Sequence, residues 1–318
     1  ILTRYRAYHG ATCGAMALTG DPRRQMWEPG VMPGVVHFLD PYRYRSTFHR
    51  TNPTISEEEF TRDYLNHLEE IIQYEGPQTI AAILMESVTG TNGIIIPPAG
   101  YMQGVREICN RYGILMIADE VMSGFGRTGK WFAVQHWGVA PDMMTMAKGL
   151  TSGYAPLGAV AMRNEIAEAF SNKVYEGGLT YNSHPLSLAA ALAVIQVMKE
   201  DRLVEHAAEM GVILSERLQW LANKHPSVGD VRSIGLFGII EVVKDRATKE
   251  PMAPFNGSSA ERTALKTYAR EQGLFLYTHW HTILIIPPLI ITKEQLYDGF
   301  EILDRALELT DAGLNRDT

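Results

Sequence analysis

The sequence predicts an α/β fold with a mostly parallel sheet in a large domain and a smaller α+β domain at the C-terminal end. Two observations carry this prediction: apolar strands alternate with a helix in the first half, and glycine-rich strand pairs mix with helices at the end. Continuous apolar strands of this kind are typical of a parallel sheet that is covered on both faces. Three of them lie between Thr79 and Lys148: "TIAAILME", "ILMIADE" and "PDMMTMAK".

Helices are expected around and after these strands. The stretch "PPAGYMQGVREICNRYG" has prolines near its start and Gly113 after its end, as helices often do. After Gly178 the chain becomes helical, with apolar residues at helical spacing in "SHPLSLAAALAVIQVMKED" and "RLVEHAAEMGVILSERLQWLANKH". We place a domain boundary near Asp201, so that residues 1–200 form the large domain and residues 201–318 the small one.

The pattern of the small domain begins at Val228. A strand pair around glycines, "VGDVRSIGLFGIIEVV", is followed by the polar stretch "KDRATKEPMAPFNGSS", which we predict to be a surface loop. An amphipathic helix near "SAERTALKTYAREQG", the strands "LFLYT" and "TILIIPP", and a helix from Thr292 complete it.

Composition favours a protein that binds small molecules. The 318 residues are 46% hydrophobic, and the net charge of -7 is spread along the chain. Because no basic cluster is interleaved with aromatic residues, nucleic acid and anionic membranes are not expected partners. No apolar run is long enough to span a membrane, and the opening "ILTRYRAYHG" lacks the pattern of a signal peptide.

Cysteine usage predicts a reducing compartment, and the cytoplasm is the expected location. Cys13 and Cys109 are far apart and lack CxxC spacing, so both are predicted to be buried as small apolar side chains. The chain opens without methionine, in what resembles the middle of a strand. We therefore expect the natural N-terminus to lie upstream of Ile1.

Three ionisable residues stand where the apolar strands end: Glu86, Asp119 and Lys148. The carboxyl ends of parallel strands form one edge of a sheet, where ligands bind in open α/β folds, so these groups should converge. One interpretation is structural, with Lys148 at the surface or in an ion pair with Asp119. The other is chemical, because a lysine desolvated among apolar neighbours is a nucleophile toward carbonyl groups.

Pyridoxal phosphate would use both residues. Its aldehyde binds an amine as a Schiff base, and an anionic partner keeps its pyridine nitrogen protonated so that the ring accepts electrons. Lys148 and Asp119 supply this pair. Once freed by an incoming amine, Lys148 is also the natural base for proton transfer at the substrate carbon.

Two further patterns lead elsewhere. Gly124, Gly126 and Gly129 match GxGxxG, which would suggest an NAD-dependent dehydrogenase, but the surrounding strand and helix that this fingerprint requires are absent. His9, His279 and His281 have no convincing partners as ligands, and "HWH" is more typical of a strand edge than of a metal site, so no metal is predicted. A non-catalytic scaffold is a third possibility.

The stretch "LMIADEVMSGFGRTGKWFAVQHWGVAPDMMTMAKGLTSGYAPLGAV" resembles the signature of class III pyridoxal-phosphate-dependent aminotransferases, which have fold type I. The resemblance continues through "YHGAT", "ILMESVTGTNGIIIPP", "LTYNSHPLSLAAALAVI" and "IIPPLIIT", and so covers nearly the whole chain. It implies the fold type I architecture, pyridoxal 5'-phosphate as cofactor, and amino-group transfer from an amine to a 2-oxo acid.

The resemblance also assigns residue roles. It makes Lys148 the Schiff-base lysine and Asp119 the partner of the pyridine nitrogen. Thr180 would reach the cofactor phosphate of a neighbouring subunit, which implies a homodimer or a tetramer built from dimers. The remaining cofactor contacts are Tyr8, stacked on one ring face, His9 and Gly10 of the same motif, Val121 on the other ring face, and Glu86 in an orienting role.

The chain departs from the family pattern in two places. Nothing upstream of "YHG" corresponds to the phosphate-binding Gly-Ser element. Relatives that use 2-oxoglutarate carry an arginine and a masking glutamate where this chain has Leu284 and Thr91. The resemblance to pyruvate-dependent ω-aminotransferases, including taurine–pyruvate enzymes, therefore predicts pyruvate as acceptor, with 2-oxoglutarate as the alternative. Taurine, β-alanine and simple amines stay open as donors, and no arginine for a carboxylate or sulfonate is identified.

Overall fold

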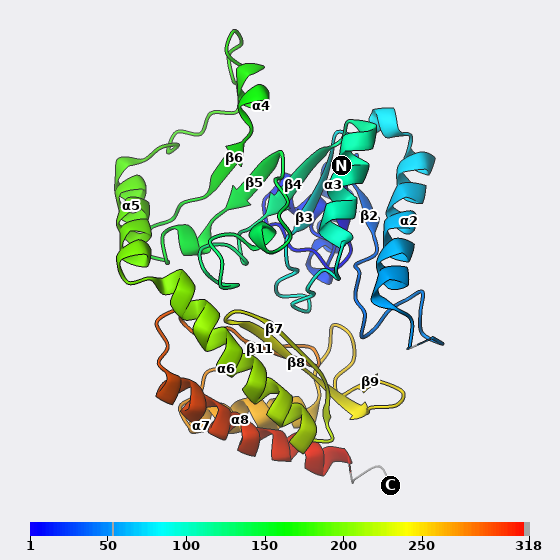
Figure 1. Cartoon of the computed structure of the whole chain (residues 1–318), viewed down its shortest axis with the longest axis vertical. Coiled ribbons are helices and arrows are strands. Elements are labelled where there is room, and N and C mark those ends of the chain that lie inside the picture. Colours follow the sequence, from blue (N-terminus) through cyan, green and yellow to red (C-terminus); the bar gives the residue numbers. More distant parts are fainter. Residues whose placement is uncertain (53, 315–318) are drawn as a thin grey trace.

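A computed structural model describes residues 1–52 and 54–314 of the chain. Two sheets organise it, a six-stranded sheet in the first half and a five-stranded sheet in the last third (Figure 1). The α/β fold with a mostly parallel sheet and a smaller α+β part is therefore as predicted.

The six-stranded sheet has the strand order β2-β1-β3-β4-β5-β6. All neighbouring pairs are parallel except β5 and β6, which are antiparallel. β3 is fully buried, as its continuous apolar sequence predicts. The strands are β1 (Leu2–Arg4), β2 (Val36–Phe38), β3 (Ala82–Glu86), β4 (Leu115–Asp119), β5 (Met143–Met146) and β6 (Ala159–Met162).

Two helices cover one side of this sheet: α2 (Glu57–Glu75) and α3 (Tyr101–Tyr112) (Figure 1). Their apolar faces pack with β1, β3 and β4 in one buried cluster that includes Phe60 and Val105. α3 ends where Gly113 adopts a left-handed conformation with φ of 67°, which glycine reaches without steric cost. The end of this helix is therefore where the sequence predicts it.

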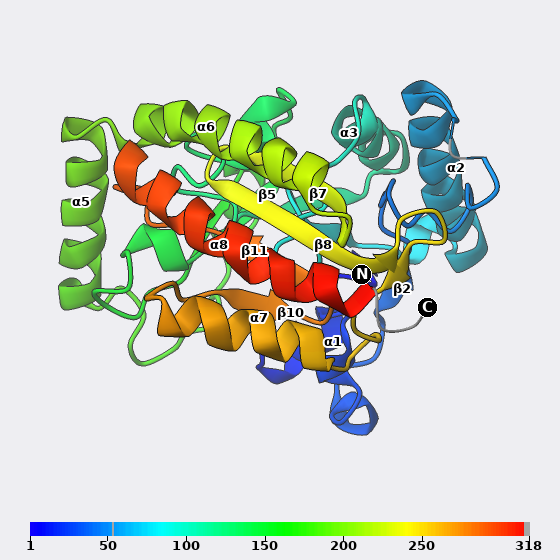
Figure 2. The same cartoon turned by 90° about the horizontal axis from the view of Figure 1, so that it is seen from below.

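The second sheet has the order β10-β11-β8-β7 and lies under three helices, α6 (Leu203–Lys224), α7 (Ala260–Glu271) and α8 (Lys293–Leu314) (Figure 2). Its strands are β7 (Val228–Ile234), β8 (Phe237–Asp245), β10 (Tyr277–His279) and β11 (Thr282–Ile285). The predicted polar loop after β8 is wrong in part. It contains β9 (Glu250–Pro251), which pairs with β8, because the chain turns back on itself and forms a short hairpin.

Buried apolar residues join the two sheets. Val88 and Ile94 from the loop after β3 pack against Phe237, Ile239 and Leu284 of the second sheet. α5 (Pro185–Glu200) leads into α6 through Arg202, which has φ of 51°. This break coincides with the boundary expected near Asp201, and the division into two domains stays a prediction.

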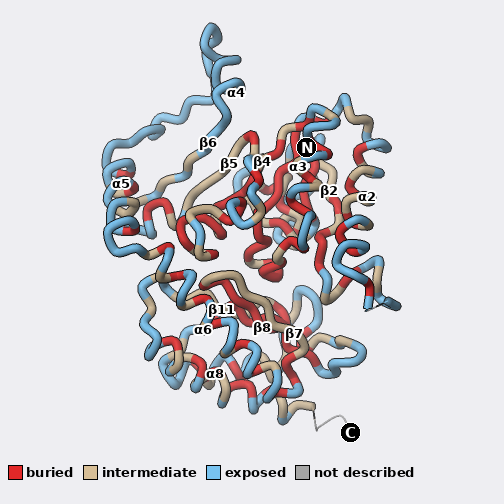
Figure 3. The backbone as a smooth tube through the Cα atoms, viewed as in Figure 1, coloured by how far each residue is buried: buried red, intermediate tan, exposed pale blue. Residues whose placement is uncertain are grey.

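The segment from β6 to α5, which includes α4 (Asn164–Glu168), stands away from the body of the molecule and is largely exposed (Figure 3). None of the helices in the described part of the chain is both long and apolar enough to span a bilayer. Cys109 is buried, and burial raises the pKa of its thiol to about 12. The predicted burial of Cys13 is wrong: it opens the short surface helix α1 (Cys13–Leu18), where its side chain is exposed.

Candidate active site

The strand register brings the predicted site residues to one edge of the six-stranded sheet. Glu86 of β3 lies opposite Asp119 of β4, and Asp119 lies opposite Thr145 of β5. Lys148 follows Thr145 by three residues, just beyond the end of β5. The convergence expected from the sequence is therefore present, because all three strands run parallel and end together.

Asp119 is buried and accepts two hydrogen bonds. Its Oδ1 accepts from the backbone N–H of Val121 at 2.9 Å, and its Oδ2 lies 2.6 Å from His9 Nδ1. The other ring nitrogen of His9, Nε2, lies 3.2 Å from Thr3 Oγ1. His9 therefore fixes the orientation of the Asp119 carboxylate.

This contact gives His9 a partner that the sequence did not reveal, the carboxylate of Asp119. The alternative in which Asp119 and Lys148 form a structural ion pair is not realised among the described residues, since the side chain that contacts the Asp119 carboxylate is that of His9. Sequence reasoning missed the contact because the two residues are separated by 110 positions.

Lys148 is exposed, so the predicted desolvation of its amine is wrong for this chain. The reason is its place in the fold: it opens the one-turn helix η5 (Lys148–Leu150) at the open edge of the sheet. Its φ of 40° is uncommon for a residue with a side chain, and such conformations cluster at functional sites. Within residues 1–52 and 54–314, no side chain or backbone atom forms a hydrogen bond or ion pair with Lys148 Nζ.

Glu86 fixes the backbone of the neighbouring loops. Its Oε1 accepts from the backbone N–H of Tyr8 at 3.1 Å, and its Oε2 accepts from that of Gly90 at 2.6 Å. Burial raises the pKa of the Glu86 carboxyl, while His9 acts in the opposite direction. These contacts suit the orienting role that the resemblance implies.

The loop that carries Tyr8 and His9 needs a glycine at its end. Gly10 has φ of 132°, and a Cβ there would lie 3.0 Å from Cβ of Ala15. Both the conformation and the close approach disfavour a larger residue. Gly10 therefore shapes the loop that places Tyr8 and His9.

The other residues predicted to contact the cofactor are Tyr8, Val121 and Thr180. Tyr8 and Val121 are half-buried beside His9 and Asp119. Thr180 lies in the exposed segment before α5, and its contact with the cofactor of another subunit stays a prediction.

Two glycines of the GxGxxG triplet, Gly126 and Gly129, lie against the second part of the molecule. Gly129 approaches α6 so closely that a Cβ would lie 3.0 Å from Cβ of Ala208, and no helix begins at this glycine. The "HWH" stretch forms the turn between β10 and β11. His279 Nε2 lies 3.2 Å from Asn92 Oδ1, and His281 lies 3.4 Å from Glu241. No cluster of three or more metal-ligating side chains occurs in the described part of the chain.

These residues fit pyridoxal phosphate. The cofactor needs an amine and a carboxylate in the same site. Here the amine of Lys148 has no partner among the described residues, and His9 holds the Asp119 carboxylate in place. The loop that carries His9 also carries the aromatic ring of Tyr8. The donor set therefore suits an aldehyde cofactor with a basic ring nitrogen.

The comparison with protein families decides between the interpretations. The model of the family described as aminotransferase class-III matches residues 1–307. This chain belongs to the class III aminotransferases. Pyridoxal phosphate is the cofactor of this family, and the predicted resemblance is confirmed.

Several relatives of this class III aminotransferase carry specific names. It is 37% identical to the taurine–pyruvate aminotransferase of Bilophila wadsworthia over 96% of this chain and 68% of that protein. It is 36% identical to the putrescine–pyruvate aminotransferase of Pseudomonas aeruginosa over 99% of this chain and 67% of that protein. The chain spans about two thirds of the length of the proteins it matches, from 65% to 70%.

Solved structures agree with this assignment. The taurine:2-oxoglutarate aminotransferase from Bifidobacterium kashiwanohense, in complex with PLP and glutamate, superimposes with a TM-score of 0.93 at 44% identity. The match covers 98% of this chain and 70% of that chain. An (S)-enantioselective ω-transaminase from Thermomicrobium roseum matches with a TM-score of 0.89 at 38% identity, over 97% of this chain and 67% of that chain.

Proposed function

We propose that this chain carries the cofactor site of an aminotransferase that moves the amino group of an ω-amino acid or a terminal amine to a 2-oxo acid, with pyruvate as the acceptor. The observation that carries the proposal is the pairing of a fixed carboxylate, Asp119, with an unpartnered amine, Lys148, at the ends of neighbouring parallel strands.

The bound cofactor supplies an electron sink that stabilises negative charge at the substrate carbon. Lys148 would hold the cofactor through its amine, and the same amine, when free, would remove and return the proton at that carbon. Asp119 would serve as the anionic partner of the ring nitrogen, and His9 keeps the Asp119 carboxylate in one orientation. Glu86 fixes the backbone of Tyr8, and Tyr8 and Val121 would contact the cofactor ring.

Pyruvate is the proposed acceptor because of the surroundings of Leu284. This residue is 2% exposed and packs against Ile239 and Ile94, so the place where some relatives carry an arginine is apolar. A second carboxylate there would lose its water without gaining a cation. Thr91 offers no charge either. The named relatives include users of pyruvate and, in one solved structure, of 2-oxoglutarate.

A half-reaction screen tests the acceptor. The amine form of the full-length enzyme is prepared with a donor, pyruvate or 2-oxoglutarate is added, and the visible absorbance of the bound cofactor is followed. We expect pyruvate to restore the absorbance at least about tenfold more efficiently, since an unpaired carboxylate in an apolar site costs more than 1.4 kcal/mol. Equal efficiency for 2-oxoglutarate would contradict this choice of acceptor.

We further propose that the enzyme is a homodimer or a tetramer built from dimers. The segment from Tyr154 to Val197 exposes many large apolar side chains, a pattern that marks protein interfaces. On α5, Leu186 is 70% exposed and Leu192 is 69% exposed. Thr180 lies in the same segment, where it would reach the cofactor of the second copy. Light scattering is expected to give at least twice the mass of one chain, and a cofactor-loaded monomer would contradict the proposal.

The cytoplasm is the proposed location. Both cysteines are free thiols, which suits a reducing compartment. Cell fractionation with an antibody against the protein would test this assignment.

A further inference from the structure

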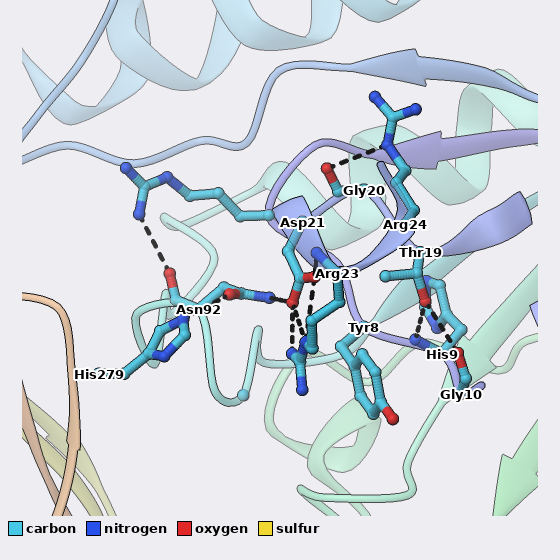
Figure 4. A network of polar contacts seen from close by, with 12 residues as sticks. Tyr8, His9, Gly10, Thr19, Gly20, Asp21, Arg23, Arg24, Asn92 and His279 are labelled. Carbon is cyan, nitrogen blue, oxygen red and sulfur yellow. Dashed lines mark hydrogen bonds and ion pairs between the residues drawn. The ribbon is translucent and has the colours of Figure 1, made fainter. Parts of the chain in front are cut away.

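Arg23 lies at the centre of a polar cluster beside Tyr8 that the proposed mechanism does not use (Figure 4). We call Asp21, Arg23, Asn92 and His279 the Arg23 cluster. Asp21 and Arg23 come from the turn after α1, where Asp21 caps the short helix η1 (Pro22–Arg24). Asn92 comes from the loop after β3, and His279 from β10 of the second sheet. Three separate parts of the chain thus meet around one guanidinium.

Asp21 holds this guanidinium by one edge. Arg23 Nε donates to both carboxylate oxygens of Asp21, at 3.1 Å and 2.8 Å, and Nη2 also donates to Oδ2. Asp21 is only 3% exposed. It accepts further hydrogen bonds from the backbone N–H of Arg23 at 2.9 Å and from Asn92 Nδ2 at 3.0 Å. The carboxylate is therefore fixed, and so is the arginine that it grips.

The rest of the cluster supports Asp21 without adding a charge. Asn92 is 2% exposed, and its Oδ1 lies 3.2 Å from His279 Nε2. Burial lowers the pKa of His279 to about 4, and the charge of Arg23 is the second cause of this shift. The His279 ring is therefore neutral near pH 7. Burial raises the pKa of Asp21, but the hydrogen bonds from Arg23 and Asn92 outweigh it and hold that pKa below its usual range. Arg23 is thus the cation and Asp21 the anion of this cluster.

The opposite edge of the guanidinium is open. A guanidinium has five N–H donors, and Asp21 uses those on Nε and one on Nη2. No residue in the described ranges accepts a hydrogen bond from Nη1, and the Arg23 side chain is 41% exposed. Such an edge matches the two oxygens of a carboxylate or sulfonate.

The open edge of the Arg23 guanidinium lies beside the proposed cofactor site. The guanidinium carbon of Arg23 lies 3.7 Å from the centre of the Tyr8 ring, which precedes the His9 that contacts Asp119. Burial lowers the pKa of Arg23, but the hydrogen bond and the charge of Asp21 raise it overall, and the phenols of Tyr8 and Tyr277 add to this effect. The open edge therefore lies one aromatic ring away from the residues assigned to the chemistry.

Neighbouring arginines are already engaged. Arg4 is fully buried, where it donates to the backbone oxygen of Glu86 and pairs with Asp40. Arg6 donates to the backbone oxygen of Asn92 and lies over the ring of Tyr42. Arg24 pairs with Glu28. Among the arginines of this region, Arg23 combines a fixed position with donors that face open space.

We propose that Arg23 binds the acidic end group, carboxylate or sulfonate, of the amine donor, with Asp21 as its positioning residue. This inference rests on the proposed aminotransferase function. It supplies the anion-binding arginine that the motifs do not reveal, and it assigns the donor to amino acids whose acidic group lies at a distance from the amine.

Donor specificity tests the assignment. The full-length enzymes to compare are Arg23→Met, Arg23→Lys and, as a matched control, Arg24→Met. Each is tested with taurine, β-alanine and n-propylamine by the loss of the cofactor's visible absorbance. For Arg23→Met we expect the half-saturating concentration of the two acidic donors to rise about 10- to 100-fold. The value for n-propylamine should not change, Arg23→Lys should recover part of the loss, and Arg24→Met should resemble wild type.

A binding measurement gives a second readout that does not depend on turnover. Ethanesulfonate and propionate carry the acidic group but no amine, and their dissociation constants can be measured by calorimetry. Weaker binding of both anions to Arg23→Met, but not to Arg24→Met, supports the proposal. A loss for ethanesulfonate alone identifies the sulfonate as the group that is bound, and a loss for propionate alone identifies the carboxylate.

The two hypotheses fail in different ways. If wild type binds its cofactor but none of the three donors changes the absorbance, the aminotransferase function is wrong. If wild type uses the acidic donors and Arg23→Met binds them as well as wild type does, the role of Arg23 is wrong. An equal loss for all three donors, n-propylamine included, also overturns it, because a general loss indicates a structural role.

Discussion

Replacing Lys148 with alanine is expected to lower amino-group transfer by about 10⁴-fold, the upper range for loss of a group that moves a proton in the transition state. The variant also loses the amine that holds the cofactor. Rates of the half-reaction with a good donor, measured by stopped-flow absorbance, give this number directly.

The loss should occur without unfolding. Lys148 is exposed, and none of the described residues bonds to its Nζ, so its removal should change the free energy of unfolding by no more than about 0.5 kcal/mol. Lys130→Ala is a suitable control, because Lys130 is an exposed lysine of the same half of the chain. Transfer at the wild-type rate in Lys148→Ala, or an equal loss in Lys130→Ala, would contradict the assignment.

The second large effect is expected for Asp119→Asn. The amide keeps the shape of the side chain, and its Oδ1 can still accept from the backbone N–H of Val121. It carries no negative charge, however, so it cannot hold a proton on the ring nitrogen of the cofactor. Removal of one preorganised electrostatic partner costs about 10²- to 10³-fold in rate. We expect a loss of this size in the single-turnover rate, with the cofactor still bound.

Asp142→Asn provides the matched control for this substitution. Asp142 is also a buried carboxylate, but it lies at the start of β5, at the opposite end of the sheet, where it pairs with Arg106 and Arg163. Its replacement should lower stability and leave the single-turnover rate of the folded enzyme close to wild type. If Asp119→Asn and Asp142→Asn lose the same fraction of the single-turnover rate, the loss at Asp119 reflects general damage to the fold.

The sequence was sufficient to predict the convergence of Glu86, Asp119 and Lys148, because parallel strands place their carboxyl ends along one edge. It also located α3, since a proline-rich start and Gly113 mark its limits. These features depend on local patterns that repeat along the chain.

Contacts between irregular segments could not be predicted from the sequence. The pair of His9 and Asp119 joins a loop to a strand across 110 positions, and no periodicity relates the two. The exposure of Lys148 depends on which segments cover the edge of the sheet, and its apolar neighbours in sequence do not determine that. The Arg23 cluster likewise requires the second sheet to approach the first, which brings His279 beside Asn92.

The position of the cofactor bond is the most direct test of the account. The full-length enzyme, with pyridoxal phosphate bound, is reduced with borohydride, digested, and analysed by peptide mass spectrometry. We expect the visible absorbance to disappear and the added mass to lie on Lys148. A stable adduct on another lysine, or a cofactor that binds and gives no adduct, would contradict the assignment of Lys148 and with it the proposed site.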